Sequence, residues 1–224
     1  MNTSVRTTGR LIAAGLRALL VLTLVLGVIY PLAVTGVAQA LFNDKADGSE
    51  ITSDGKVVGS SLIGQSYLLP KENPDDPDEA ARPDLRWFQP RPSNGLGTNL
   101  VNTQYSLILS GATNRAGNNT ELIQWVKEAK AAVIADNTAK GWKPAPGDVP
   151  PDAVTSSGSG LDPHISPAYA ELQIRRVAER NGLGVESVEK LVKDHTDDRI
   201  LGFIGEPRVN VLELNVALRE SLSR

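Results

Sequence analysis

The sequence predicts an α+β protein, with a single N-terminal transmembrane helix followed by one α+β extracytoplasmic domain. Three observations predict this class. Residues 18–43 form a long apolar run, short β-branched segments follow it, and several later stretches repeat apolar residues at three- and four-residue steps. Strand segments interspersed with segregated helices of this kind are typical of α+β domains.

The apolar run at residues 18–43 contains no charged residue. As a helix rising about 1.5 Å per residue it would span roughly 39 Å, more than the roughly 30 Å of hydrocarbon in a bilayer. Residues 1–17 contain arginines and no acid, whereas acids predominate just after the run. Because basic flanks stay on the cytoplasmic side, we expect residues 1–17 in the cytoplasm and residues 44–224 outside. Pro31 is compatible with this anchor, since membrane helices tolerate proline as a kink.

A cleaved secretory signal is the alternative for the same run. Ala38-Gln39-Ala40 has the small-x-small pattern that precedes signal cleavage. The apolar core of a signal is usually about 7 to 15 residues long, whereas this run continues to Phe42. A retained anchor is therefore favoured, and cleavage after Ala40 would instead release a secreted binding domain.

The totals limit the classes of function. After the anchor, about 180 residues remain, enough for one domain with its own core. The chain has no cysteine, which excludes a disulfide framework, a thiolate metal site and a cysteine nucleophile. A formal charge of −3 with no long basic run argues against a nucleic-acid partner, because phosphate neutralisation needs clustered Lys and Arg.

The first half of the domain is predicted to be strands and loops. Residues 56–69, KVVGSSLIGQSYLL, favour one or two strands broken by a turn. Residues 70–92 are rich in proline and acids, which predicts an exposed, extended loop. Trp87 and Phe88 are large apolar residues in that polar loop. We expect them to fold back and cap the core, with a partner contact as the alternative.

The next segment is predicted to change from loop to helix. Residues 93–119 are rich in Gly, Asn, Ser and Thr, with one short strand expected at 105–109. Apolar residues then recur at helical spacing, which predicts a helix with Thr120 as its N-cap that ends near Asn137. Residues 152–156, DAVTS, are predicted to form a short buried strand.

The C-terminal third is predicted to be mainly helical. Ser166 is placed as an N-cap with Pro167 as the first helical residue, and the helix should stop at Asn181-Gly182. A second amphipathic helix should follow over residues 185–195, so that the two make a helical hairpin.

A last helix is predicted to follow the segment 200–204. Asn210 and Glu213 have capping-box spacing at its start. Its apolar residues, Val211, Leu214, Leu218 and Leu222, share one face.

The loop before the helix at Pro167 allows two interpretations. Ser157-Gly158-Ser159-Gly160 could bind a phosphate, because flexible backbone amides at a helix N-terminus attract anions. The loop lacks the Gly-Lys-Ser/Thr ending of a P-loop, and Asp162 places a negative charge where the phosphate would sit. We therefore favour a tight turn whose hydroxyls cap the helix.

The histidines provide little chemistry. His164 has Asp162 nearby and His195 is flanked by acids, but zinc needs three or four ligands at recognisable spacing. Ser157 or Ser159 with His164 and Asp162 could form a Ser/His/Asp triad, yet the G-x-S-x-G elbow is absent. We expect no catalytic and no metal residues.

Several motifs occur in order along the chain. They are Tyr30-Pro31-Leu32, Gly59-Ser60-Ser61-Leu62-Ile63-Gly64-Gln65, Phe88-Gln89-Pro90-Arg91-Pro92-Ser93, Val154 to Pro167 (VTSSGSGLDPHISP) and Gly205 to Asn215 (GEPRVNVLELN). Together they resemble the C subunit of the Kdp potassium-transporting ATPase. One stretch departs, since the family usually has Ser-Gly-Gly-Ser-Asn-Leu where this chain has Ser110 to Arg115, SGATNR.

The resemblance implies a non-catalytic, single-pass subunit of the cell membrane. Its partners would be a channel-like subunit that selects potassium and a P-type ATPase subunit that hydrolyses ATP. The resemblance also implies a catalytic chaperone that raises the affinity of the ATPase subunit for ATP, with no cofactor bound tightly by this chain. The charge pattern, however, places residues 44–224 outside, away from cytoplasmic ATP.

Two hypotheses follow. The leading one is an assembly and regulatory domain that covers the extracytoplasmic mouth of the potassium-selecting subunit; the alternative is a domain that itself binds nucleotide. The candidate nucleotide or partner contacts are Ser157, Gly158, Ser159, Gly160, Leu161, Asp162 and His164. The family motifs add partner contacts at Gln65, Arg91, Ser93, Glu206, Arg208 and Asn210.

Overall fold

The computed structural model describes residues 3–73, 75–76, 79–93, 110–111 and 114–223. The chain divides into two compact units, Met1–Ser49 and Glu50–Arg224. Helices and sheets both occur, which confirms the predicted α+β class. The strand expected at 105–109 lies outside the described residues.

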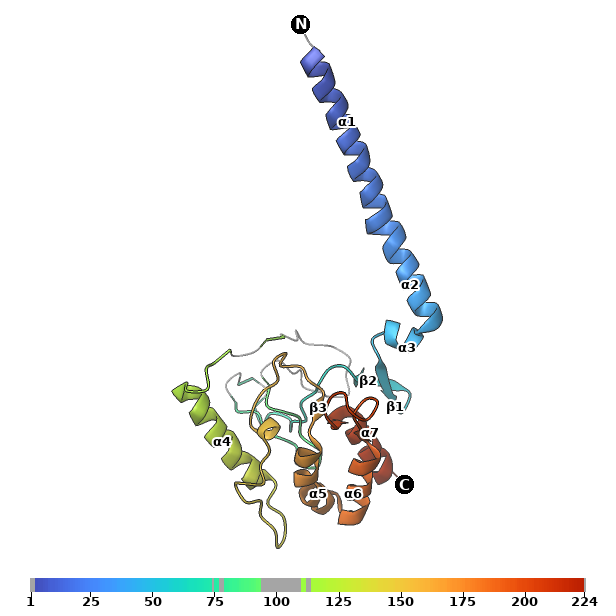
Figure 1. The fold of residues 1–224 in the computed structure, drawn as a ribbon. Helices are drawn as coiled ribbons and strands as arrows, with labels where there is room; N and C mark the ends of the chain where they lie inside the picture. Colours follow the sequence, from blue (N-terminus) through green and yellow to red (C-terminus); the bar gives the residue numbers. More distant parts are fainter. Residues whose placement is uncertain (1–2, 74, 77–78, 94–109, 112–113, 224) are drawn as a thin grey trace. The chain divides into compact units, whose positions relative to one another are not determined.

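The N-terminal unit is a long helix followed by a short one. Its helical segments are α1 (Thr3–Leu24), the π-helix η1 (Val25–Ile29), α2 (Tyr30–Leu41) and α3 (Asn43–Ala46), as Figure 1 shows. The stretch Arg6–Leu41 has a mean hydropathy of 2.4 in its most apolar window, and that window is not buried against the protein. By length and composition it can cross a membrane.

The π-helical turn η1 ends two residues before Pro31. The Tyr30 amide donates to the Val25 carbonyl, five residues back instead of four. Proline cannot donate to the helix ladder, and its ring crowds the carbonyl four residues before it. A π turn is one of the recognised defects through which a helix absorbs such a residue. The helix therefore continues through Pro31.

The C-terminal unit begins with a β-hairpin of β1 (Glu50–Ser53) and β2 (Lys56–Ser60). Asp54 and Gly55 connect the strands, with φ of 51° and 72°. Positive φ at both central residues is the requirement of the type I′ turn, for which Asp-Gly is a favoured pair. The predicted strand near residue 56 is thus confirmed, with a partner strand ahead of it.

A second, three-stranded antiparallel sheet has the order β3-β5-β4. Its strands are β3 (His164–Ile165), β5 (Arg208–Asn210) and β4 (Thr196–Asp197). His164 pairs with Asn210, and Thr196 pairs with Val209. The sheet therefore joins the loop before α5 to the residues just before α7.

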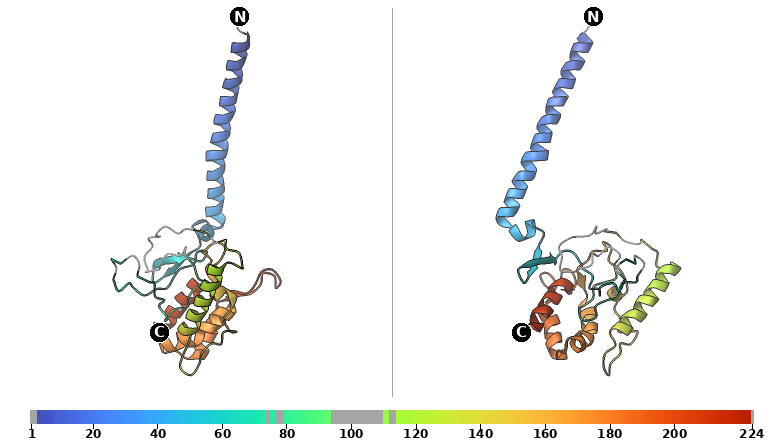
Figure 2. Two further views of the ribbon diagram at one scale, coloured as in Figure 1. Left: turned by 90° about the vertical axis from the view of Figure 1, so that its left-hand side faces the viewer. Right: turned by 180° about the vertical axis from the view of Figure 1, so that it is seen from behind.

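The helices of this unit are α4 (Thr120–Asp136), α5 (Pro167–Asn181), α6 (Val185–Asp194) and α7 (Val211–Leu222). Figures 1 and 2 show α5, α6 and α7 side by side, with α4 on the other side of the loop region. Val133 of α4 belongs to the same apolar core as Leu172 of α5 and Leu214 of α7. One core thus unites the helices.

Local capping explains several helix ends of the C-terminal unit. The Ser166 hydroxyl accepts from the Tyr169 amide, and α5 ends at Gly182 with φ of 66°. The Asn210 side chain accepts from the amides of Leu212 and Glu213 at the start of α7. These predicted caps are confirmed. The two helices predicted between Pro167 and His195 also form a hairpin.

The predicted N-cap of α4 was wrong by one residue. Asn119, with an extended backbone, accepts from the Leu122 amide, and Thr120 is already helical. Asparagine is at least as good an N-cap as threonine, which explains why Asn119 rather than Thr120 caps the helix.

The strand predicted at 152–156 was also wrong. A 3₁₀ turn, η2 (Pro151–Ala153), occupies this place. The amides of Ala153 and Val154 donate three residues back, to Pro150 and Pro151, and the Thr155 hydroxyl donates to the Pro151 carbonyl. Consecutive prolines fix φ near −65°, which suits a 3₁₀ turn better than a paired strand.

The loop predicted at 70–92 is exposed only in its first part. From Asp84 onward it runs along the core, and Phe88 is completely buried. Trp87 packs against the same core in part. The favoured prediction, that Trp87 and Phe88 fold back onto the core, is confirmed, whereas the prediction of an exposed loop fails for residues 84–92 apart from Arg86.

Buried polar side chains hold this segment in place. Asn215 of α7 accepts from the Phe88 amide and donates to the Phe88 carbonyl, both at 2.9 Å. Gln173 of α5 accepts from the Gln89 amide at 2.7 Å and donates to the Gln89 carbonyl at 3.1 Å. Irregular backbone inside a protein needs such partners, because an unpaired buried amide or carbonyl is costly. We call residues 85–89 with these side chains the brace.

Arg176 of α5 completes the brace. Its guanidinium is buried and donates to the carbonyls of Leu85 and Trp87 and to the side chains of Asn137 and Gln173. Burial lowers its pKa to about 10, so the group remains charged at neutral pH.

Asn215→Ala should destabilise the chain by about 2 to 4 kcal/mol, because it leaves the buried Phe88 amide and carbonyl without partners. For a domain of this size that lowers Tm by about 5 to 10 °C. Thermal unfolding of the detergent-solubilised full chain measures the change. Asn118→Ala, at an exposed turn, is the control and should stay within about 0.5 kcal/mol of the parent chain. Equal Tm values for the two variants would contradict the role given to the brace.

Candidate functional site

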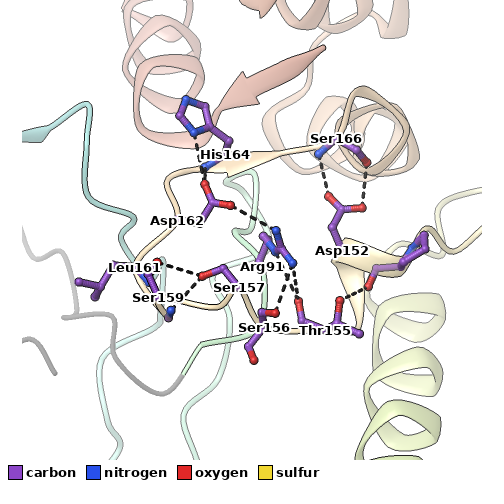
Figure 3. Close-up of polar contacts among 12 residues, drawn as sticks. Arg91, Asp152, Thr155, Ser156, Ser157, Ser159, Leu161, Asp162, His164 and Ser166 are labelled. Atoms are coloured by element: carbon purple, nitrogen blue, oxygen red, sulfur yellow. Dashed lines mark hydrogen bonds and ion pairs between the residues drawn. The ribbon is translucent and has the colours of Figure 1, made fainter. Parts of the chain in front are cut away.

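The predicted contact residues at 157–164 lie in one loop that leads from η2 to β3. Figure 3 shows this loop wrapped around the side chain of Arg91. Arg91 and Ser93 follow the brace in sequence and come from a distant part of the chain. The structure thus brings two of the family-motif residues into contact with the predicted loop.

Arg91 is bonded on several sides. Its Nη1 lies 3.2 Å from an Asp162 carboxylate oxygen, and its Nε and Nη2 lie 3.4 Å from the Thr155 carbonyl. Nη2 also donates to the Ser156 carbonyl at 3.3 Å. A guanidinium has five donors in a planar fork, which suits such multiple bonding. Arg91 therefore joins the two ends of the loop.

The loop is closed on its other side by short contacts. The Ser93 hydroxyl donates to the Gly160 carbonyl, and the Gly111 amide donates to the Ser159 carbonyl at 2.8 Å. Ser110 donates to the same Ser159 carbonyl through its hydroxyl at 3.0 Å. The segment that departs from the family pattern, residues 110–115, thus touches the loop at its first two residues.

The hydroxyls of the loop cap its own backbone. The amides of Gly160 and Leu161 donate to the Ser157 and Ser159 hydroxyls at 2.9 and 3.1 Å. The His164 amide donates to Asp162 at 3.0 Å. A phosphate cradle would need amides such as these free to face the anion. This bonding favours a tight turn over a phosphate cradle. The prediction that the loop hydroxyls cap the helix was wrong, because they accept from amides within the loop and Ser166 caps α5.

Asp162 is the one acid in residues 157–164. Its hydrogen bond with the His164 ring, at 3.3 Å, holds the pKa of the carboxyl below its usual range, and the His164 amide and the Arg91 charge act in the same direction. These effects outweigh partial burial, which would raise the pKa. In the described part of the chain, the His164 ring makes no hydrogen bond to Ser157 or Ser159, as a hydrolytic triad would require.

A neighbouring acid anchors the end of the loop. Asp152 accepts from both the amide and the hydroxyl of Ser166, at 2.7 and 2.9 Å. Ser166 in turn caps α5. Among the described residues, no three His, Asp or Glu side chains converge as metal ligands would.

Two hollows lie on either side of the loop. One, of about 570 Å³, is lined by Arg91, by Leu62 and Ile63, and by residues 157–159 and 161–163. The other, of about 520 Å³, lies between the loop and α4. Both fall in the size range of small-molecule sites, and both are also large enough to receive a side chain of another protein.

The remaining family-motif residues either bond within the fold or lie away from the loop at 157–164. Gln65 donates to the Val58 carbonyl at 2.9 Å and occupies the space where a side chain at Gly59 would lie. Asn210 caps α7 and donates to the Ser61 carbonyl at 2.8 Å. The Gly64 amide links this region to the loop through the Leu161 carbonyl.

Glu206 and Arg208 lie apart from the loop, Glu206 on the connection between β4 and β5 and Arg208 at the start of β5. Glu206 pairs with Arg199 at 2.5 Å, and Arg208 pairs with Asp197 at 3.4 Å. Both pairs are largely exposed. The predicted site residues therefore fall into two groups on the domain.

The sequence reasoning missed two features. Arg115 stacks over the Trp125 ring at 4.3 Å, beside the second hollow. The apolar residues of segment 200–204 are exposed, and no prediction was made for their burial. The sequence contains a sign of this exposed segment. A short apolar run with a central glycine lies between Arg199 and Glu206 and matches neither strand nor helix periodicity.

The comparisons with known proteins agree on one family. Residues 12–220 match the family model described as KdpC, K+-transporting ATPase, c chain. A Potassium-transporting ATPase KdpC subunit of Streptomyces avermitilis is 69% identical over 98% of both chains. The protein of the same name from Streptomyces coelicolor is 67% identical over 98% of this chain and 96% of its own length. The one from Mycobacterium tuberculosis is 42% identical over 93% of this chain and 97% of its own length.

Gly160→Ala should destabilise the loop by about 1 to 3 kcal/mol, because φ at this position is 69° and an added Cβ would lie 2.9 Å from the Gly111 carbonyl oxygen. Gly158→Ala is the matched control, since open space surrounds that position and its φ is ordinary. Thermal unfolding of the two full-length variants compares them. A Gly158→Ala chain as unstable as the Gly160→Ala chain would contradict this description of the loop.

Proposed function

This chain belongs to the K+-transporting ATPase c-chain (KdpC) family, and on that premise we propose how its domain serves the complex. In our proposal the chain is the single-pass accessory subunit of the potassium-transporting ATPase, and its α+β domain lies outside the cytoplasm. There it assembles with the potassium-selecting subunit and covers the outer mouth of that subunit.

One observation carries this proposal. The polar groups of the loop at 157–164 bond to one another, to Arg91 and to Ser93, and so form a rigid surface. A rigid, internally satisfied surface suits a protein contact, in which complementarity matters more than reactive groups. The location outside is supported by the arginines before the membrane-spanning run and the acids after it.

A second candidate function is nucleotide binding through Ser157–His164, by which the chain would act as a chaperone for ATP binding. The hollow beside Arg91 favours it by size and by its hydroxyls. Against it, Arg91 is bonded to Asp162 and to two carbonyls, so a phosphate would have to displace these bonds. The predicted orientation also separates the loop from cytoplasmic ATP. We therefore place this function second.

Removing the chain tests the proposed function. Cells that lack it should fail to grow when potassium is scarce, because the remaining subunits assemble poorly; restoring the full chain should rescue growth. Purified complexes report the cause through subunit yield and potassium-stimulated ATPase activity. Unchanged assembly and uptake without the chain would refute the proposal.

The same preparations separate the alternatives. Protease added outside intact cells should remove the domain, and an intact domain would contradict the orientation. ATP titrated against the purified full chain should give no saturable binding. Saturable binding that Arg91→Ala abolishes, and that Arg180→Ala at an exposed position of α5 leaves intact, would favour the nucleotide function. Mass spectrometry of the mature N-terminus distinguishes a retained anchor from cleavage after Ala40.

A further inference from the structure

The connection between β4 and β5 displays apolar side chains to solvent. Ile200 and Ile204 pair across it, with reciprocal backbone hydrogen bonds of 2.9 and 3.0 Å. The exposed fractions are 58% for Ile200, 80% for Leu201, 71% for Phe203 and 47% for Ile204. We call these four residues the apolar tip. In the left view of Figure 2 this connection projects from the helices of the domain.

The backbone of the apolar tip is left-handed at two residues. Leu201 has φ of 54° and Gly202 has φ of 81°. Branched and bulky residues rarely adopt left-handed backbone, whereas glycine does so freely. Leu201 therefore exposes its side chain while its backbone adopts a conformation that leucine disfavours. Backbone strain of this kind gathers at ligand clamps and binding sites.

The charges at the base of the tip are mostly cancelled. Arg199 pairs with Glu206, and Arg208 pairs with Asp197. Asp198 adds one more acid, so residues 197–208 carry three acids against two arginines. A tip that enters a lipid surface usually has basic residues, Trp or Tyr beside its apolar side chains. This segment has no Trp, Tyr or Lys, and both of its arginines are paired.

The family is named as a subunit of a potassium-transporting ATPase, so the chain has partner subunits against which an exposed apolar patch can pack. Large exposed apolar patches rimmed by polar residues mark protein interaction sites, and buried aromatic anchors dominate the energetics of such sites.

We propose that the apolar tip inserts into an apolar pocket on the potassium-selecting subunit of the complex, with Leu201 and Phe203 as anchors. The slight acidic excess at its base predicts uncharged or basic residues around that pocket. This inference rests on the proposed function, since it names the surface through which the chain meets its complex.

The absence of cysteine makes the test direct. Phe203→Cys introduces the only thiol of the chain, and its reaction rate with a maleimide reports exposure. We expect rapid reaction when the chain alone is reconstituted in lipid vesicles. In the complete complex, with partner subunits free of accessible thiols, the rate should fall at least about tenfold. Glu186→Cys, exposed on α6, is the control and should react rapidly in the chain alone.

Leu201→Gly provides a second variant that does not depend on labelling. It removes one anchor and suits the positive φ, so Tm of the chain alone should stay the same or rise. The yield of assembled complex should nevertheless fall. An unchanged yield of assembled complex, whatever the Tm, would overturn the inference.

The outcomes separate the inference from the proposed function. If the parent chain copurifies with its partners but the thiol from Phe203→Cys reacts equally fast in the complex, the apolar tip is not the contact and the function stands. If that thiol is already protected in vesicles that hold the chain alone, lipid covers the tip and the inference is overturned. If the parent chain does not copurify at all, the proposed function itself fails.

Discussion

The domain depends on the polar brace that fastens an irregular segment into its core. The Phe88 ring is buried in the apolar core, and the backbone of Phe88 is buried with it. Asn215 and Gln173 supply donor and acceptor pairs that replace water for Phe88 and Gln89. Each such bond contributes about 1 kcal/mol net, but leaving the same groups unpaired would cost more. The brace therefore ties α5 and α7 to a loop far from them in sequence.

The brace also sets the position of the loop at 157–164. Arg91 and Ser93 lie a few residues beyond Phe88, and they are the groups that join the ends of the loop at 157–164. The β3–β5 pairing fixes the far end of that loop beside the cap of α7. A surface built in this way is rigid because its contacts reach back to the buried core. Such rigidity suits a subunit that recognises a partner through shape.

Local signals in the sequence predicted the helices well, and long-range contacts escaped prediction. Ser166-Pro167 and Asn210 cap their helices through bonds within three residues, so the sequence alone could reveal them. The bond between Arg91 and Asp162 spans 71 residues, and no spacing rule encodes it. The error at 152–156 has a local cause, because two prolines outweighed β-branched composition. The exposure of Phe203 depends on where the β4–β5 connection points, which periodicity cannot provide.

Hydrogen exchange on the full chain, with and without Asn215→Ala, tests most directly whether the brace positions the loop. In the parent chain the amides of Phe88, Gln89, Gly160 and Leu161 are all hydrogen-bonded and should exchange slowly. In the variant, protection should fall at both pairs together. If Phe88 and Gln89 lose protection while Gly160 and Leu161 keep theirs, the loop stands independently of the brace and the account is contradicted.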